Sequence, residues 1–155
     1  MKSKREEIKH FNIRVYGIYI NNNMELLLSD EFRFGKKMTK LPGGGLKFGE
    51  GTIDCLKREA LEEFNQEIEV VSHFYTTDFF QKAFFYKGQQ LISIYYLINF
   101  SEPIKFKISS KPFDFPDLKE NNQSYRFVSI KDMQIKDLTF PIDQIVMEKL
   151  FKAYF

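Results

Sequence analysis

The sequence predicts a domain of the α+β class, in which a mixed β-sheet is packed between helices as an α/β/α sandwich. Two stretches of strand-like alternation flank a stretch of helical periodicity, and a second helical stretch follows near the end of the chain. That order is typical of helices packed on a mixed sheet. A length of 155 residues suits one domain over 1–155 with a sizeable core.

The first elements are predicted to be a β-hairpin and a tight loop. Residues 11–20 are rich in Val, Ile and Tyr and alternate with period 2, which predicts a strand. The run of three Asn at 21–23 is a turn signal, and 25–29 forms a short second strand. The Pro-Gly-Gly-Gly run at 42–45 argues against regular structure and predicts a loop.

A helix is predicted over 52–64. Gly51 or Thr52 caps it, and Asp54 favours its positive end. At about 100° per residue, an apolar stripe faces the core. Its members are Ile53, Leu56, Ala60 and Phe64.

The remaining strands and the last helix follow in the second half. Residues 109–122 hold Pro, Asn and charged side chains, which predicts a long surface loop of the kind that often carries function. Pro141 suits the first turn of a final helix. Strands are predicted at 68–77, 91–100 and 125–129, with a further candidate at 104–108.

Composition narrows the class of protein. A net charge of +2 and a pI of about 8.5 are too weak for a nucleic-acid surface. The basic run Lys2, Lys4 and Arg5 is expected to be a solvated terminus. We expect no membrane span and no signal peptide. Cys55 is the only cysteine, which fits a reducing compartment and hence the cytoplasm.

Three carboxylates are predicted to crowd one face of the helix over 52–64. Glu59, Glu62 and Glu63 are spaced i, i+3 and i+4, so they repel one another unless a cation lies between them. Hard oxygen ligands suit Mg²⁺ or Mn²⁺. Glu50 would add a fourth oxygen from the loop side, and Arg58 would hold a carboxylate in place.

Glycines lie directly before these carboxylates. Gly43, Gly44, Gly45 and Gly49 allow close backbone approach to a bound group, and their N–H groups would face phosphate oxygens. An acidic helix or a glycine loop alone is usually only solvated surface. The two in this order and spacing indicate a phosphate-processing site.

The segment 44–66 resembles the Nudix box, G-x5-E-x7-R-E-U-x-E-E-x-G-U, in which U is a bulky aliphatic residue. Ala60 is a common variant at the first U, and the lead-in 41–45 is also similar to the family. Asn65 replaces the usual Gly, where Asn is the next-best left-handed cap, and Gln66 replaces an aliphatic residue. The matching positions are Gly44, Glu50, Arg58, Glu59, Glu62 and Glu63.

The resemblance implies a Nudix-like fold and a hydrolase that cleaves the diphosphate bond of a nucleoside diphosphate linked to another moiety. ADP-ribose, nucleoside triphosphates and nucleotide sugars all remain open as substrates, and a homodimer is allowed. Mg²⁺ or Mn²⁺ would be held by Glu59, Glu62, Glu63 and Gly44, and substrate by Gly43–Gly45. A non-catalytic nucleotide-sensing module is the alternative, although such proteins commonly lose a box glutamate and none is lost here.

Several roles stay open at this stage. The general base is Glu50, Glu63 or, in the long loop, Glu120, which is otherwise an exposed charge. Cys55 is a small spacer or a sensor of the metal site, and His10 and His73 are read as structural. The aromatic segments 32–34, 79–85 and 113–115 would stack on a base or form a dimer interface.

Overall fold

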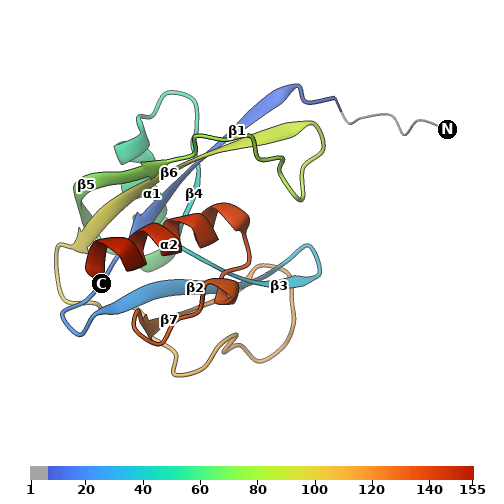
Figure 1. The fold of residues 1–155 in the computed structure, drawn as a ribbon. Coiled ribbons are helices and arrows are strands. Elements are labelled where there is room, and N and C mark those ends of the chain that lie inside the picture. The colour runs from blue at the N-terminus through green and yellow to red at the C-terminus, as the bar shows by residue number, and fades with distance from the viewer. Residues whose placement is uncertain (1–6) are drawn as a thin grey trace.

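The structure is a computed structural model that describes residues 7–155, so the basic run Lys2, Lys4 and Arg5 lies outside the described residues. Its α+β class agrees with the sequence prediction. Two sheets and two α-helices make up the described part (Figure 1). The elements are β1 (His10–Ile18), β2 (Glu25–Arg33), β3 (Lys36–Lys40), β4 (Gly43–Gly45), α1 (Thr52–Phe64), β5 (Ile68–Thr76), β6 (Gln89–Phe100), β7 (Asn122–Ser129), the 3-10 helix η1 (Ile135–Asp137) and α2 (Pro141–Tyr154).

The strands form two sheets where the sequence suggested one. The first has the order β4-β1-β6-β5 and is mixed, because β1 and β6 run parallel while the other pairs are antiparallel. The second has the order β3-β2-β7 and is antiparallel throughout. Both sheets contribute to one core, with α2 lying across them in Figure 1.

The predicted hairpin of the first two strands is wrong. β1 already has β4 on one edge and β6 on the other, so β2 cannot pair alongside it. Only the bridge between Ile20 and Leu26 joins the two segments. The turn signal itself is correct, because the side-chain oxygen of Asn21 accepts hydrogen bonds from the backbone N–H groups of Asn23 and Glu25.

The loop predicted for the glycine run is wrong, because these residues form strand β4. Gly43–Gly45 pairs antiparallel with β1, with Gly44 opposite Val15. Gly43 has φ +153°, and a Cβ there would come within 2.1 Å of the carbonyl oxygen of Val15. Glycine therefore permits a ladder contact that a larger residue would block.

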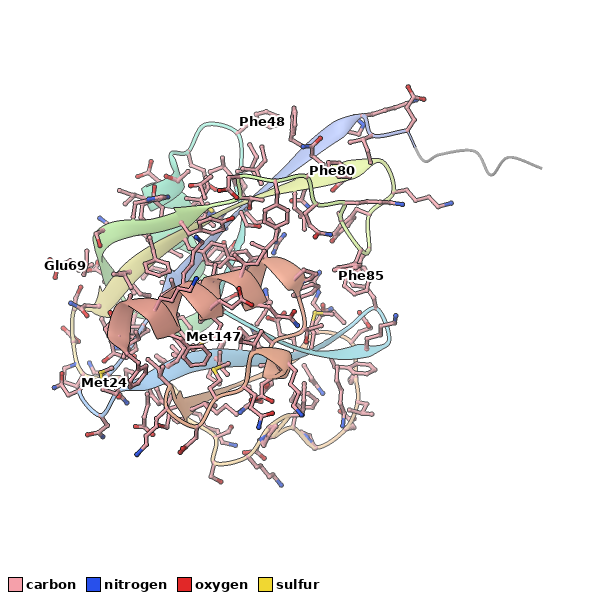
Figure 2. The ribbon with its side chains drawn as sticks, in the orientation of Figure 1. Met24, Phe48, Glu69, Phe80, Phe85 and Met147 are labelled. Atoms are coloured by element: carbon pink, nitrogen blue, oxygen red, sulfur yellow. The ribbon has the colours of Figure 1, made fainter. Side chains whose placement is uncertain are left out.

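Alternate residues of β1 and β2 face opposite layers, as period-2 patterning requires. Val15 and Leu27 pack with α1, whereas Tyr16 and Leu28 pack with α2. Met147 of α2 points at β2 in Figure 2 and is fully buried. Strands β1 and β2 thus pack against α1 on one face and against α2 on the other.

The candidate strand at 104–108 is absent, and this segment is a docked loop. The side chain of Gln66 holds it, donating to the carbonyl oxygen of Pro103 and accepting from the backbone N–H of Lys105. Phe106 packs into the core beside α1. These side-chain contacts satisfy the backbone without a ladder, which explains why the loop is ordered but irregular.

Helix α1 has the predicted bounds, and its end confirms the reading of Asn65. This residue is left-handed, with φ 52° and ψ 35°, and its N–H donates to the carbonyl oxygen of Leu61. At the start, the Asp54 side chain accepts from the backbone N–H of Gly51. Asn65 thus performs the C-cap function that glycine usually provides.

Candidate active site

The buried face of α1 differs from the predicted stripe at its first turn. Cys55, Leu56, Ala60 and Phe64 are buried, whereas Ile53 is 43% exposed. The first turn meets the glycine strand β4 closely, with the Cys55 thiol 3.5 Å from the carbonyl oxygen of Gly45. Burial raises the pKa of that thiol to about 12, which supports the spacer reading of Cys55.

Arg58 is the centre of a cluster of carboxylates. Its Nη1 lies 2.9 Å from Oε1 of Glu59 and 3.3 Å from Oε2 of Glu62. Its Nη2 also donates to the carbonyl oxygen of Gly45 at 3.0 Å, which ties the helix to β4. The guanidinium therefore fixes two of the predicted metal-binding carboxylates relative to the glycine strand.

Glu50 is the third carboxylate on this guanidinium. Arg58 donates to both of its oxygens, at 2.9 and 2.7 Å, and the backbone N–H of Lys47 donates to one of them. The bonds from Arg58 hold the pKa of Glu50 down at about 2. Glu50 is thus an ionised side chain that closes the 46–50 loop onto α1.

Gly44 brings β4 into contact with the Glu59 carboxylate. A Cβ at Gly44 would lie 2.3 Å from Oε1 of Glu59. Any other residue at this position would displace the carboxylate, so the glycine is needed for a close approach rather than for an unusual backbone angle.

Glu63 has the most perturbed carboxyl group of the site. Burial raises its pKa to about 8, with added repulsion from Glu59 and Glu31 against the opposing charge of Lys40. Its Oε2 is buried and has no hydrogen-bond partner among the described residues. An orphaned buried oxygen of this kind fits the coordination shell of a hard cation.

A pocket opens beside Glu59 and Glu63, and we call it the carboxylate pocket. The glycine strand forms one wall of it, and basic side chains from β1, β2 and β3 form another. Glu50, Arg58 and Glu62 lie outside its lining, and Glu62 is largely exposed. The lining residues are Arg14, Glu31, Arg33, Lys40, Gly43, Gly44, Gly45, Glu59, Glu63, Tyr86, Asn121 and Gln123.

Glu120 does not line this pocket. Its carboxylate accepts a hydrogen bond from the backbone N–H of Gly35 at 2.9 Å, in the turn between β2 and β3. Its neighbours Asn121 and Gln123 do line the pocket. The long loop therefore reaches the site through these amides.

A second hollow adjoins the carboxylate pocket, and we call it the aromatic cavity. Phe34 from the β2–β3 turn stacks on Phe85 from the β5–β6 loop, with ring centroids 4.7 Å apart. Figure 2 shows Phe85 reaching from its loop toward β3. The aromatic rings that line the cavity are those of Tyr16, Phe34, Phe84, Phe85, Tyr86, Tyr95 and Phe140.

The two hollows share Arg14, Glu31, Arg33, Lys40 and Tyr86, so they are adjacent. The segments 32–34 and 79–85 thus supply rings to the cavity, and their stacking on a substrate base stays a prediction. The segment 113–115 does not: the Phe113 ring lies under the Lys37 ammonium, away from both hollows.

The predicted metal ligands do not form a closed cage. Among residues 7–155, no group of three His, Cys, Asp or Glu side chains is arranged to hold a metal ion. Arg58 occupies one side of Glu59 and Glu62, while Glu63 faces the carboxylate pocket. The glutamates of one helical face are therefore adjacent but point to two environments.

The family model of the NUDIX domain matches residues 10–149. The chain belongs to this family. The match spans nearly all of the described elements, including both sheets and α1. It confirms the resemblance seen in segment 44–66 and supports the predicted class of enzyme, a hydrolase of pyrophosphate bonds. Nudix hydrolases generally use divalent metal ions and act on small nucleotide substrates.

Several solved structures share this fold at low sequence identity. The E. coli ORF135 protein is 15% identical, with a TM-score of 0.69 over 93% of this chain and 91% of that one. A MutT NUDIX hydrolase from Burkholderia pseudomallei is 16% identical, with a TM-score of 0.69 and coverages of 92% and 99%. An ADP-ribose pyrophosphatase from Streptococcus suis is 12% identical, with a TM-score of 0.56 and coverages of 93% and 94%. A comparison with curated proteins finds no match to the sequence.

Two further findings bear on the sequence predictions. No helix of residues 7–155 is long and apolar enough to cross a membrane. His73 bonds to the Thr76 hydroxyl and packs edge-on against Tyr96, and His10 is exposed at the start of β1. Neither histidine lines the carboxylate pocket.

Sequence reasoning missed the basic lining of the carboxylate pocket. Arg14, Arg33 and Lys40 come from three strands and carry no motif. The only available signal was weak, because Arg14 falls on the polar face of an alternating strand that also carries His10 and Asn12.

Proposed function

We propose that this Nudix protein hydrolyses the diphosphate bond of a nucleoside diphosphate linked to another moiety, with Mg²⁺ or Mn²⁺ as cofactor. The observation that carries the proposal is that the carboxylate pocket and the aromatic cavity are adjacent and share five lining residues. A planar base suits the cavity, and a charged diphosphate suits a pocket with glutamates on one side and guanidinium groups on the other. ADP-ribose, nucleoside triphosphates and nucleotide sugars all meet this description.

We assign the metal to Glu59, Glu62, Glu63 and the carbonyl oxygen of Gly44. The unpaired Oε2 of Glu63 and the Arg58 clamp on the other two carboxylates support this assignment. When bound, the cation supplies charge neutralisation for the diphosphate and lowers the pKa of the attacking water. Arg58 orients carboxylates and does not touch substrate.

The chain's own part is positioning and proton transfer. Phosphoryl transfer needs little covalent chemistry from the protein. Of the three candidate bases, Glu50 is bonded through both oxygens to Arg58, and Glu120 is bonded to Gly35. Glu63 lines the pocket, so it is the candidate that the geometry supports best as proton acceptor, through the carboxylate oxygen that does not hold the cation.

The first experiment compares Glu62→Gln with Glu69→Gln on a panel of nucleoside triphosphates, ADP-ribose and nucleotide sugars. Glu69 is exposed on β5 and points away from the body of the molecule (Figure 2). We expect Glu62→Gln to lose at least about a hundredfold in rate with Mg²⁺ or Mn²⁺, and Glu69→Gln to keep its rate.

Full activity of Glu62→Gln with an unchanged circular dichroism spectrum would overturn the metal-site assignment. If the wild-type protein bound a nucleotide in the presence of Mg²⁺ but released no product, the domain would be a nucleotide-sensing module instead. Product identity in the same assay distinguishes the remaining substrates.

We also propose a single domain over residues 1–155 and a location in the cytoplasm. The family match over 10–149 supports the first proposal, and the lone cysteine supports the second. A homodimer remains allowed, and sedimentation of the full chain would establish the oligomeric state.

A further inference from the structure

Two arginines of the site have no carboxylate partner. Among residues 7–155, ion pairs below 4 Å are formed by Arg58 with three glutamates and by Arg126 with Asp30, but none by Arg14 or Arg33. Both of the unpaired side chains are half-buried, and both line the carboxylate pocket and the aromatic cavity. Partial burial of an unpaired cation costs free energy, so this placement calls for an anion.

Arg14 is held in one orientation by its own strand. Its Nε donates to the Tyr16 hydroxyl at 2.7 Å, and its guanidinium carbon lies 5.7 Å from the centroid of the Tyr16 ring. Tyr16 is buried, so this anchor is rigid. The Nε bond leaves both Nη groups free to donate, and Nη1 lies against Gly45, 3.6 Å from where a Cβ would stand. Arg14 therefore sits at the glycine strand, close to Glu59.

Arg33 approaches the same space from the other sheet. It ends β2, and its guanidinium carbon lies 5.2 Å from the centroid of the Phe34 ring. That ring belongs to the stack with Phe85 at the aromatic cavity. Arg33 has no side-chain hydrogen bond to any other described residue, so all of its N–H groups are available.

Lys40, by contrast, is a cation of this pocket whose charge is neutralised by a carboxylate of the protein. Its ammonium lies 3.1 Å from Oε2 of Glu31, and both side chains are 7% exposed. The Ser29 hydroxyl donates to the same carboxylate. Lys40 is neutralised within the protein, so the uncompensated positive charge of the pocket belongs to Arg14 and Arg33.

We infer that Arg14 and Arg33 together bind the phosphate that joins the base-bearing half of the substrate to its scissile bond. This rests on the proposed function and adds to it a specificity role: two guanidinium groups, one from each sheet, grip the non-bridging oxygens at the junction of the two hollows. The grip sets how far the diphosphate reaches toward Glu59 and Glu63. It thereby selects the phosphorus that faces the attacking water.

The binding test uses α,β-methylene nucleoside diphosphates of the four common bases, with the phosphate-free nucleosides as matched probes, in calorimetry with Mg²⁺. We expect Arg14→Met and Arg33→Met each to weaken diphosphate binding about tenfold to a hundredfold while nucleoside binding stays unchanged. Arg→Lys variants should recover part of the loss. Lys105→Met, an exposed and peripheral charge, should leave binding unchanged.

Equal losses for nucleoside and diphosphate would show that the arginines only support the fold, and would overturn the inference. So would undiminished diphosphate binding in the double variant, or an absence of diphosphate binding to the wild-type protein. Failure of the proposed function is a separate result, because it appears as nucleotide binding without product release by the wild-type protein, whatever the arginine variants do.

The regiochemical test follows the reaction in ¹⁸O-labelled water with the best substrate of the panel. The wild-type protein should place label on one phosphorus, and the Arg14→Met, Arg33→Met double variant should distribute it over both. Label confined to one phosphorus in the double variant would show that the arginines do not select the scissile bond.

Discussion

The charged residues of helix α1 and of strand β2 differ in how far along the sequence their ion-pair partners lie. These two elements face each other across the carboxylate pocket. On α1, Arg58 meets three carboxylates that lie within eight residues of it in the sequence. On β2, Asp30 is fully buried and bonds to Arg126, 96 residues away. The α1 cluster can be predicted from the sequence because its partners are close neighbours, whereas the pair of Asp30 with Arg126 cannot.

The difference has an energetic side as well. The α1 carboxylates keep contact with solvent or with the pocket, so they can accept a ligand. The Asp30 carboxylate has no such freedom, because the Thr39 hydroxyl, the Phe113 N–H and two nitrogens of Arg126 occupy it. The first cluster is open to a ligand, whereas the second holds three strands and a loop together.

The largest effect is expected from Asp30→Asn. This change removes the charge, leaves Arg126 half-buried without its partner and weakens the anchor of the 109–121 loop, so we expect a loss of about 3–5 kcal/mol in the free energy of unfolding. Urea denaturation measures it. Glu102→Gln, which removes an exposed pair with Lys105, is the control and should cost less than about 0.5 kcal/mol. A loss below about 1 kcal/mol for Asp30→Asn would remove the contrast between the two elements.

A smaller effect is expected from Glu63→Gln, which should raise the free energy of unfolding at high pH instead of lowering it. The pKa of Glu63 is raised from 4.5 to about 8, so between those values the folded protein retains a proton that the unfolded chain has lost. Wild-type stability therefore falls as pH rises through this window, whereas the Glu63→Gln variant has no group to titrate there. The variant should match the wild type near pH 4.5 and exceed it by on the order of 2 kcal/mol near pH 9 without metal.

If Glu63 binds Mg²⁺, added Mg²⁺ should make the wild type more stable than the Glu63→Gln variant. Added Mg²⁺ near pH 9 should raise the melting temperature of the wild type but leave that of Glu63→Gln unchanged. A variant that is less stable than the wild type near pH 9 in chelator would contradict the buried, perturbed state of this carboxyl group.

The smallest effect is expected at the end of α1. Asn65 has φ 52°, which glycine adopts without strain, so Asn65→Gly should change the free energy of unfolding by only about 0.5 kcal/mol. Asn65→Ala should cost about 1 kcal/mol, because alanine tolerates this region poorly. Equal stabilities for the Gly and Ala variants would show that the left-handed cap is unimportant.

Sequence reasoning recovered what depends on local pattern. The bounds of α1, the turn at Asn21 and the left-handed cap at Asn65 all follow from neighbouring residues, and each is confirmed. The assignment of the Nudix family was also within reach, because its motif is contiguous.

The errors came from partners that are remote in sequence. β2 was predicted to end at residue 29, because Asp30 looks like a surface residue until Arg126, 96 residues away, is placed beside it. β3 was not predicted, because Lys36 and Lys37 at its start interrupt any apolar alternation. Gln66 departs from the family motif because the carbonyl oxygen of Pro103 and the N–H of Lys105 are its partners.

The parallel pairing of β1 with β6 has a consequence for how the chain acquires its fold. Residue 10 lies opposite residue 89, so the central ladder of the first sheet closes a loop of nearly eighty residues. In the same way, β2 can pair with β7 only after the chain has been synthesised beyond Asn122, where β7 begins. Such non-local ladders slow folding, since chain entropy is lost before the contacts that compensate it are made. On a ribosome, the glutamates and glycines of the motif emerge well before β6 and β7, so the carboxylate pocket is incomplete until Asn121 and Gln123 have been synthesised.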